Sequence, residues 1–203
     1  MRDSDIRVAL LELLLAKHRS DPGTLIRDEV GLCAGKRRID VVTVNTELTG
    51  YEIKSDQDTL LRLAAQAEAY GRVLDRAILV TTKRHLDGAR AMLPPWWGII
   101  VARAEQHSIR LEDVRPPTLN NQYDAFSLAQ LLWREEALEE LRLRGKGLGL
   151  SKKARYYVCV SLAEAVPLNE LRSIVHVRLK ARPEWPGGQP QMPYGMTQVW
   201  RYE

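Results

Sequence analysis

Three charged side chains in the first half of the chain have the types and spacing of a hydrolytic metal site. Glu52 and Lys54 lie two residues apart in the strand-like segment YEIKS, so both side chains occupy one face. Asp40 is the only charge in the preceding segment IDVVTVN, and a hairpin between the two strands would bring it beside Glu52. Neighbouring carboxylates repel unless a cation lies between them, and oxygen ligands suit Mg²⁺ or Mn²⁺.

Asp40, Glu52 and Lys54 together would have the residue types of a catalytic site. Lys54 would hold a nucleophilic water or stabilise the charged transition state of phosphodiester hydrolysis, with Asp40 and Glu52 as metal ligands. A solvated face of an amphipathic strand is the alternative explanation of the Glu-x-Lys spacing. Gln66 and Tyr70 lie four residues apart in the next predicted helix and share one side of it. As alternatives, Gln66 is a boundary residue and Tyr70 is a core residue.

The elements that must position these residues alternate between helical and strand-like patterns. Apolar residues at helical spacing predict helices over 4–18, 59–75 and 86–93. Short runs rich in β-branched and apolar residues predict strands over 24–32, 38–45, 51–55, 76–82 and 96–103. This order is typical of an α/β fold with a mixed central sheet flanked by helices.

The array RID…YEIK…QAEAY resembles the PD-(D/E)xK nuclease superfamily, and its Gln-x3-Tyr resembles the branch typified by recombination exonucleases. The array is also similar to a group of small, poorly characterised bacterial proteins of that superfamily. The superfamily's proline before the first acid is absent, since Arg38 and Ile39 precede Asp40. The resemblance covers the first half of the chain and implies a restriction-endonuclease-like fold.

The resemblance also implies roles for individual residues. Asp40 and Glu52 are the implied metal ligands, with the main-chain carbonyl of Ile53 as a third. Lys54 is the implied catalytic lysine. Gln66 and Tyr70 are implied to support the catalytic site or to contact DNA.

Three further residues near the array are candidates with simple alternatives. Members of the superfamily often carry an upstream glutamate that completes the metal site, and Glu29 is the candidate here; a surface acid beside Asp28 is the alternative. Arg38 and Arg62 are candidate DNA-binding residues that contact phosphate, or else solvated surface charges, and Arg38 could instead pair with a carboxylate.

The chain changes character after residue 117, where a nuclease-like core over 1–117 is predicted to end. Residues 118–182 are predicted to form a helical extension, with one continuous helix over 125–145, and 183–203, rich in proline and glycine, a loose tail. Six basic and no acidic residues occupy 141–155. This stretch resembles a SAP-type helix-turn-helix, which implies DNA binding by Lys152, Lys153 and Arg155. A solvated basic loop is the alternative.

Bulk composition is compatible with these predictions. The 203 residues suffice for one good core, and a net charge of +4 permits a nucleic-acid partner without requiring one. Two distant cysteines, no signal-peptide pattern and no membrane-length apolar run favour a cytoplasmic protein without a membrane. The sequence therefore predicts a Mg²⁺- or Mn²⁺-dependent deoxyribonuclease of unknown oligomeric state. A non-catalytic DNA- or partner-binding module with the same fold, or a plain α/β scaffold, are the alternatives.

Overall fold

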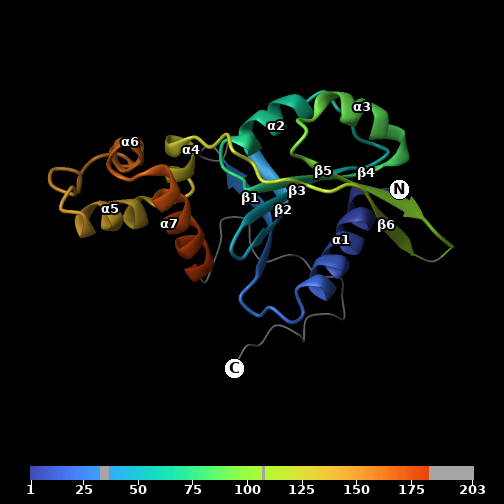
Figure 1. Cartoon of the computed structure of the whole chain (residues 1–203), viewed down its shortest axis with the longest axis horizontal. Coiled ribbons are helices and arrows are strands. Elements are labelled where there is room, and N and C mark those ends of the chain that lie inside the picture. Colours follow the sequence, from blue (N-terminus) through green and yellow to red (C-terminus); the bar gives the residue numbers. More distant parts are fainter. Residues whose placement is uncertain (33–36, 107, 183–203) are drawn as a thin grey trace.

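A computed structural model of the chain describes residues 1–32, 37–106 and 108–182 (Figure 1). Those residues form a six-stranded mixed sheet flanked by helices, which confirms the predicted α/β class. The tail predicted for 183–203 lies outside the described residues. No helix in the described part of the chain combines the length and apolar character needed to cross a membrane.

The strands follow one another across the sheet in sequence order. The first three pair antiparallel, the third to the fifth pair parallel, and the last is antiparallel to its neighbour. Parallel neighbours require crossover connections, which the helices after the third and fourth strands supply. The strands are β1 (Leu25–Leu32), β2 (Arg37–Val44), β3 (Leu48–Lys54), β4 (Arg76–Thr82), β5 (Gly98–Ala104) and β6 (Ile109–Arg115).

Helices cover both faces of this sheet and continue beside it (Figure 1). One face packs against the first helix, and the opposite face packs against the second and third helices. The helices are α1 (Asp3–Lys17), α2 (Leu63–Gly71), the 3₁₀ turn η2 (Lys83–His85), α3 (Leu86–Met92), α4 (Ala125–Ala129), α5 (Arg134–Leu143), α6 (Arg155–Ala165) and α7 (Leu168–Ala181).

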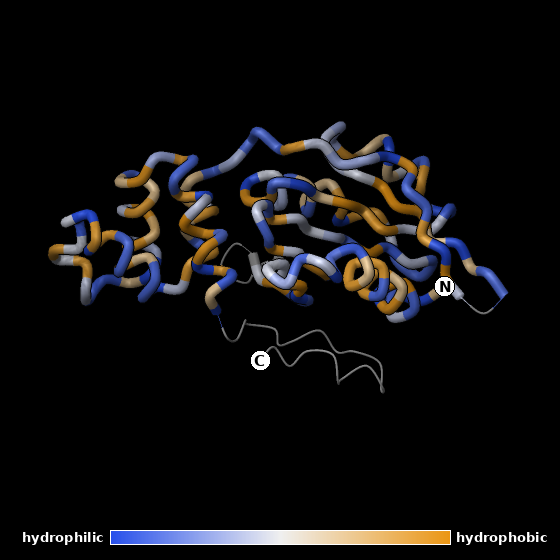
Figure 2. Tube along the Cα trace, turned by 60° about the horizontal axis from the view of Figure 1, so that its bottom comes forward, coloured by the Kyte–Doolittle hydropathy of each residue, from blue (hydrophilic) through white to orange (hydrophobic). Residues whose placement is uncertain are grey.

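Two apolar clusters fill the interior, one on each face of the sheet. Ile6, Leu10 and Leu14 of α1 pack against Tyr51 and Ile53 of β3 in the first cluster. The second cluster begins under α2 and runs without a break into α4–α7. Figure 2 shows the same arrangement: hydrophobic positions of these helices turn toward the sheet or toward one another. The helical extension therefore shares its core with the sheet.

The structure differs from the sequence prediction in three elements. Strand β6 was not predicted, because it is an edge strand whose Arg110, Glu112 and Asp113 are exposed and interrupt its apolar pattern. Helix α2 is shorter than the predicted 59–75. The continuous helix expected over 125–145 is divided into α4 and α5. The Trp133 amide donates a hydrogen bond of 2.6 Å to the Glu136 carboxylate, and this contact caps the start of α5.

A buried carboxylate ties the helical extension to the sheet. Asp75, at the start of β4, is fully buried. It accepts hydrogen bonds from the Leu48 amide at 2.6 Å and the Tyr123 hydroxyl at 2.7 Å. Arg172 and His176 of α7 also pair with it, His176 through Nε2 at 3.0 Å. These contacts fix α7 against the sheet where β3 and β4 begin.

Candidate functional site

The residues singled out in the sequence meet on the sheet face covered by α2. Side chains alternate along β3, so Tyr51 and Ile53 pack toward α1 while Glu52 and Lys54 face α2. All seven residues of β3 are buried, which follows from its central place in the sheet. The alternative of a solvated strand face is therefore excluded.

Glu52 is the centre of a buried hydrogen-bonded cluster. Its residue is only 2% exposed, and its Oε1 accepts from both the Lys54 ammonium and the Gln66 side-chain amide. Its Oε2 accepts from the Tyr70 hydroxyl. Lys54 is itself buried, so its charge is neutralised by Glu52 rather than by water. These four side chains form one network, which we call the Glu52 cluster.

Helix α2 contributes the two uncharged members of the Glu52 cluster. Tyr70 is fully buried, and its ring stacks on Trp97 with centroids 5.5 Å apart. Burial, followed by the nearby charge of Glu52, raises the pKa of the Tyr70 hydroxyl and keeps it a donor. Gln66 Oε1 is buried without a hydrogen-bond partner among the described residues. Tyr70 thus combines the predicted core position with a polar contact to the cluster.

Asp40 lies beside this cluster at the point where β2 and β3 separate. The ladder between the two strands ends at the pair Val41 and Tyr51, and Asp40 Oδ2 then accepts from the Ile53 amide at 2.7 Å. Arg7 of α1 donates to the Asp40 backbone carbonyl at 2.9 Å and to Oδ1 at 3.3 Å. Burial and then the negative charge of Glu52 raise the pKa of Asp40 to about 6.

Glu29 is connected to Asp40 through Arg7. Its backbone φ is 54°, in the left-handed region that a residue with a β-carbon seldom adopts. Its carboxylate lies 2.6 Å from Arg38 Nε and 3.4 Å from Arg7. Arg7 was not predicted as a site residue, because no spacing rule links a residue of α1 to a strand residue 33 positions later. Arg38 is 68% exposed at this edge of the sheet.

The charges around Asp40 and Glu52 balance within the protein. Among the described residues, no group of three or more His, Cys, Asp or Glu side chains is arranged to hold a metal ion. Asp40 and Glu52 are nevertheless a pair of hard oxygen donors of the kind that Mg²⁺ and Mn²⁺ prefer, and a cation bound there would compete with Arg7 for Asp40 and with Lys54 for Glu52. The paired groups are the carboxylates of Glu29, Asp40 and Glu52 and the cations of Arg7, Arg38 and Lys54.

The other predicted DNA-binding residues lie outside the Glu52 cluster. Arg62 is exposed immediately before α2. Lys152 and Lys153 are exposed before α6, in the helical extension beside the sheet (Figure 1). Arg155 is partly buried and donates to the carbonyls of Gln130 and Leu132, so its guanidinium holds the turn between α4 and α5.

Asp40 should titrate with a midpoint near pH 6 in protein kept free of metal with EDTA. This pKa lies above the value of about 3.9 in an unfolded chain, so the folded state binds the proton more tightly. The free energy of unfolding should therefore fall as the pH rises from about 4 to about 6. Asp40→Asn should remove this fall and stabilise the protein by about 2 kcal/mol at pH 7.

Carbon-13 NMR of the carboxyl groups and urea unfolding at a series of pH values measure both effects. A midpoint for Asp40 near the value of about 3.9 in an unfolded chain would contradict the raised pKa.

Comparison with known proteins gives matches over nearly the whole chain. The family model described as bacteriophage P4 protein cII matches residues 1–184. Protein cII of enterobacteria phage P4 is 24% identical over 182 residues, which cover 90% of this chain and 68% of that protein. Among solved structures, the SPO1766 protein of unknown function from Silicibacter pomeroyi is 19% identical, with a TM-score of 0.41. The match covers 75% of this chain and 98% of that chain.

These matches overturn the nuclease prediction. The family found is that of phage P4 protein cII, and neither it nor its curated relative points to the PD-(D/E)xK superfamily. The assignment to that superfamily and the predicted deoxyribonuclease activity were therefore wrong. One match spans 1–184, so it also replaces the SAP-type resemblance of the extension. The Asp-x11-Glu-x-Lys pattern is short, and here its side chains chiefly neutralise one another and their neighbours.

Proposed function

The chain belongs to the bacteriophage P4 protein cII family, and we propose that it is a non-catalytic DNA-binding protein. The helical extension holds the sugar-phosphate backbone in this proposal. The observation that carries it is an exposed set of cations in the last turn of α5 and between α5 and α6, in the segment 142–153, which we call the basic loop. These cations are Arg142, Lys146, Lys152 and Lys153.

The basic loop is held in a defined conformation at both ends. Helix α5 ends in a Schellman motif, in which the Gly145 amide donates to the Arg142 carbonyl and the Lys146 amide to the Leu141 carbonyl. Gly145 and Gly149 have φ values of 68° and 76°, which glycine adopts without strain. At the other end, Arg134 donates to the carbonyls of Ser151 and Lys153.

The charge of the basic loop is available to a polyanion. No acidic residue occurs between residues 141 and 155. None of its four exposed cations forms an ion pair with the described residues. Arg144, by contrast, is paired with Glu140 at 2.8 Å and with Glu170. DNA that binds here would release the counterions condensed on its phosphates. This release favours association irrespective of the base sequence.

Several sequence predictions remain part of this proposal. Arg38 and Arg62 are exposed and are proposed as secondary phosphate contacts, whereas the Arg155 guanidinium holds the turn between α4 and α5. The cytoplasm is the proposed location, because a free buried thiol at Cys159 suits a reducing compartment.

Binding of Mg²⁺ or Mn²⁺ is likewise proposed, with Asp40 and Glu52 as the residues that would hold the cation. A bound divalent cation would favour the ionised form of Asp40 and so lower the pKa of that carboxyl group. Adding Mg²⁺ to the NMR titration should therefore move the midpoint of Asp40 below pH 6. An unchanged midpoint at high Mg²⁺ concentration would contradict the proposal, whatever the outcome for DNA.

Neutralising the basic loop should weaken DNA binding and flatten its salt dependence. Each lost phosphate contact lowers the slope of log K against log salt by about 0.9 for duplex DNA. The triple variant Lys146→Gln, Lys152→Gln, Lys153→Gln should therefore lose about 2–3 units of slope. Fluorescence anisotropy with a labelled duplex over a range of salt concentrations measures both quantities.

The matched control removes the same charge elsewhere. Lys17, Arg19 and Lys180 are exposed on α1, the segment after it, and α7. Their triple replacement by glutamine should lower affinity only through the reduced net charge and leave the slope nearly unchanged. Equal slopes for the two triple variants would show that the basic loop does not contact the backbone.

A further inference from the structure

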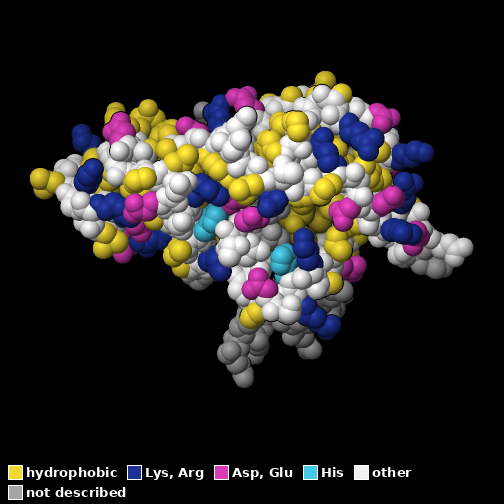
Figure 3. Space-filling view, in the orientation of Figure 1, with side chains coloured by type: hydrophobic (Ala, Val, Ile, Leu, Met, Phe, Trp, Pro, Cys, Tyr) yellow, Lys and Arg dark blue, Asp and Glu magenta, His cyan; other side chains and the backbone are white. Residues whose placement is uncertain are grey.

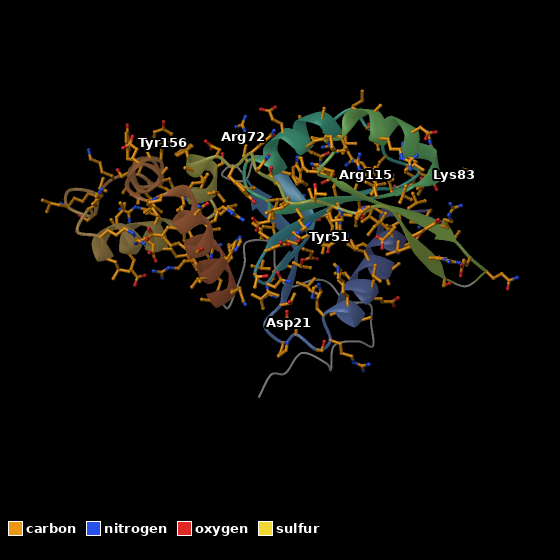
Figure 4. The ribbon with its side chains drawn as sticks, in the orientation of Figure 1. Asp21, Tyr51, Arg72, Lys83, Arg115 and Tyr156 are labelled. Carbon is orange, nitrogen blue, oxygen red and sulfur yellow. The ribbon has the colours of Figure 1, made fainter. Side chains whose placement is uncertain are left out.

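Two tyrosines stand exposed beside the basic loop. Tyr156 and Tyr157, in the first turn of α6, are 58% and 57% exposed. Figure 4 places Tyr156 on the outer side of α6, at the end of the molecule away from the sheet. We propose that these rings form a stacking platform for unpaired bases, so that the ligand of the extension is single-stranded DNA. This proposal rests on the proposed function, because the lysines of the basic loop hold the phosphates.

The two rings are braced by their neighbours while one side of each stays open. Tyr156 packs edge-on against Phe126, with centroids 5.3 Å apart and an interplanar angle of 70°. Tyr157 stands nearly perpendicular to Tyr156 at 5.4 Å. Lys153 Nζ lies 5.9 Å from the centre of the Tyr157 ring. Such contacts limit ring rotation, which reduces the entropy that is lost when a base stacks on the ring.

The tyrosines are not required by the core of the extension. Val158, Cys159 and Leu162 are the residues that bury the inner side of α6. Two adjacent aromatic side chains on the outer side leave apolar surface in water, which marks interaction sites when it is contiguous. Their flat faces fit the faces of nucleobases, since every base stacks on an aromatic ring irrespective of sequence.

The charge around the tyrosines favours nucleic acid over an apolar protein partner. Lys152 and Lys153 lie three to five residues before the two tyrosines, and both are exposed. Figure 3 shows yellow and dark blue side chains next to one another at this end of the molecule. Proteins that bind single-stranded nucleic acid combine cations, which contact the phosphates, with aromatic rings, on which the bases stack. Glu164, two turns further along α6, is an exposed acid that limits the platform on that side.

Affinity for a labelled oligothymidylate and for a duplex of equal length tests the platform. Stacking on one tyrosine is worth about tenfold in affinity. Tyr156→Ala and Tyr157→Ala should each weaken single-strand binding by about that factor and change duplex binding by less than about threefold. Tyr156→Phe and Tyr157→Phe should bind like the wild type, because the ring is retained. Thermal unfolding checks that each variant is folded, which matters most for Tyr156→Ala because it loses the contact with Phe126.

Leu143→Ala and Leu148→Ala are the matched controls, because they remove exposed apolar surface from the same extension without removing a ring. Unchanged single-strand affinity in both Tyr156→Ala and Tyr157→Ala would overturn the stacking platform and leave binding to the DNA backbone intact. A wild type that prefers the duplex would do the same. Binding of neither DNA would instead overturn the proposed function. If light scattering shows that the wild type is an oligomer and that Tyr156→Ala or Tyr157→Ala dissociates it, the tyrosines serve self-association and the inference is overturned.

Discussion

Asp75→Asn should lower the free energy of unfolding by about 3 kcal/mol, the lower end of the range for breaking a buried ion pair. The fully buried carboxylate accepts from the Leu48 amide and the Tyr123 hydroxyl and pairs with Arg172 and His176. An amide carries no charge and offers one acceptor oxygen, so it leaves the Arg172 guanidinium without its anion. Because Arg172 retains some exposure, water replaces part of that loss.

Urea unfolding of Asp75→Asn and of Glu47→Gln measures the effect against a matched control. Glu47 pairs with Arg76 at 2.6 Å close to Asp75, but both side chains are about one-third exposed. The control should therefore lose less than about 1 kcal/mol. Equal losses in the two variants would show that the buried carboxylate does not fix α7 to the sheet.

The effect of Asp75→Asn should also depend on pH. Burial alone would raise the pKa of Asp75, but hydrogen bonds from His176, Leu48, Tyr123 and Arg172 outweigh it and hold the pKa well below its ordinary value. A carboxylate with a depressed folded pKa stabilises the protein above its unfolded pKa of about 3.9 and loses that contribution as the pH falls. The difference between wild type and variant should therefore be full at pH 6 and shrink below pH 4.

Glu52→Ala should cost about 3–5 kcal/mol of the free energy of unfolding, because it leaves the Lys54 ammonium buried without an anion. The double variant Glu52→Gln, Lys54→Met should recover most of this loss. It removes both charges, keeps an oxygen acceptor for the Tyr70 hydroxyl and fills the space of the lysine stem. Chemical denaturation of both variants and of Lys54→Met alone completes the comparison.

An exposed pair provides the control for Glu52. Glu112 pairs with Arg103 at 2.7 Å on the solvent-facing side of β5 and β6, so Glu112→Gln should change stability little. A double variant that is as unstable as Glu52→Ala would show that the cluster depends on geometry beyond charge pairing. Duplex affinity of the double variant should equal that of the wild type, because the proposed DNA contacts lie chiefly in the basic loop.

The sequence by itself determined the features that depend on local pattern. Strand β4 was predicted with its observed bounds, because a short apolar run between turn signals is visible in neighbouring residues. The α/β class followed from the order of such segments. The grouping of Glu52 with Lys54 and of Gln66 with Tyr70 also followed, since alternation along a strand and the helical repeat are local rules.

Only the tertiary structure decided what those grouped residues contact and what their charges do. The pairing of Arg7 with Asp40 and of Arg172 with Asp75 joins residues 33 and 97 positions apart. Such contacts depend on how helices pack on the sheet, which no local periodicity contains. In the folded protein the Asp40 carboxylate pairs with Arg7 of α1, Glu52 and Lys54 neutralise each other, and Gln66 and Tyr70 of α2 donate hydrogen bonds to Glu52. A charged side chain has its chemistry set by its surroundings, because burial and neighbouring charges decide whether it binds a proton, a cation or another residue.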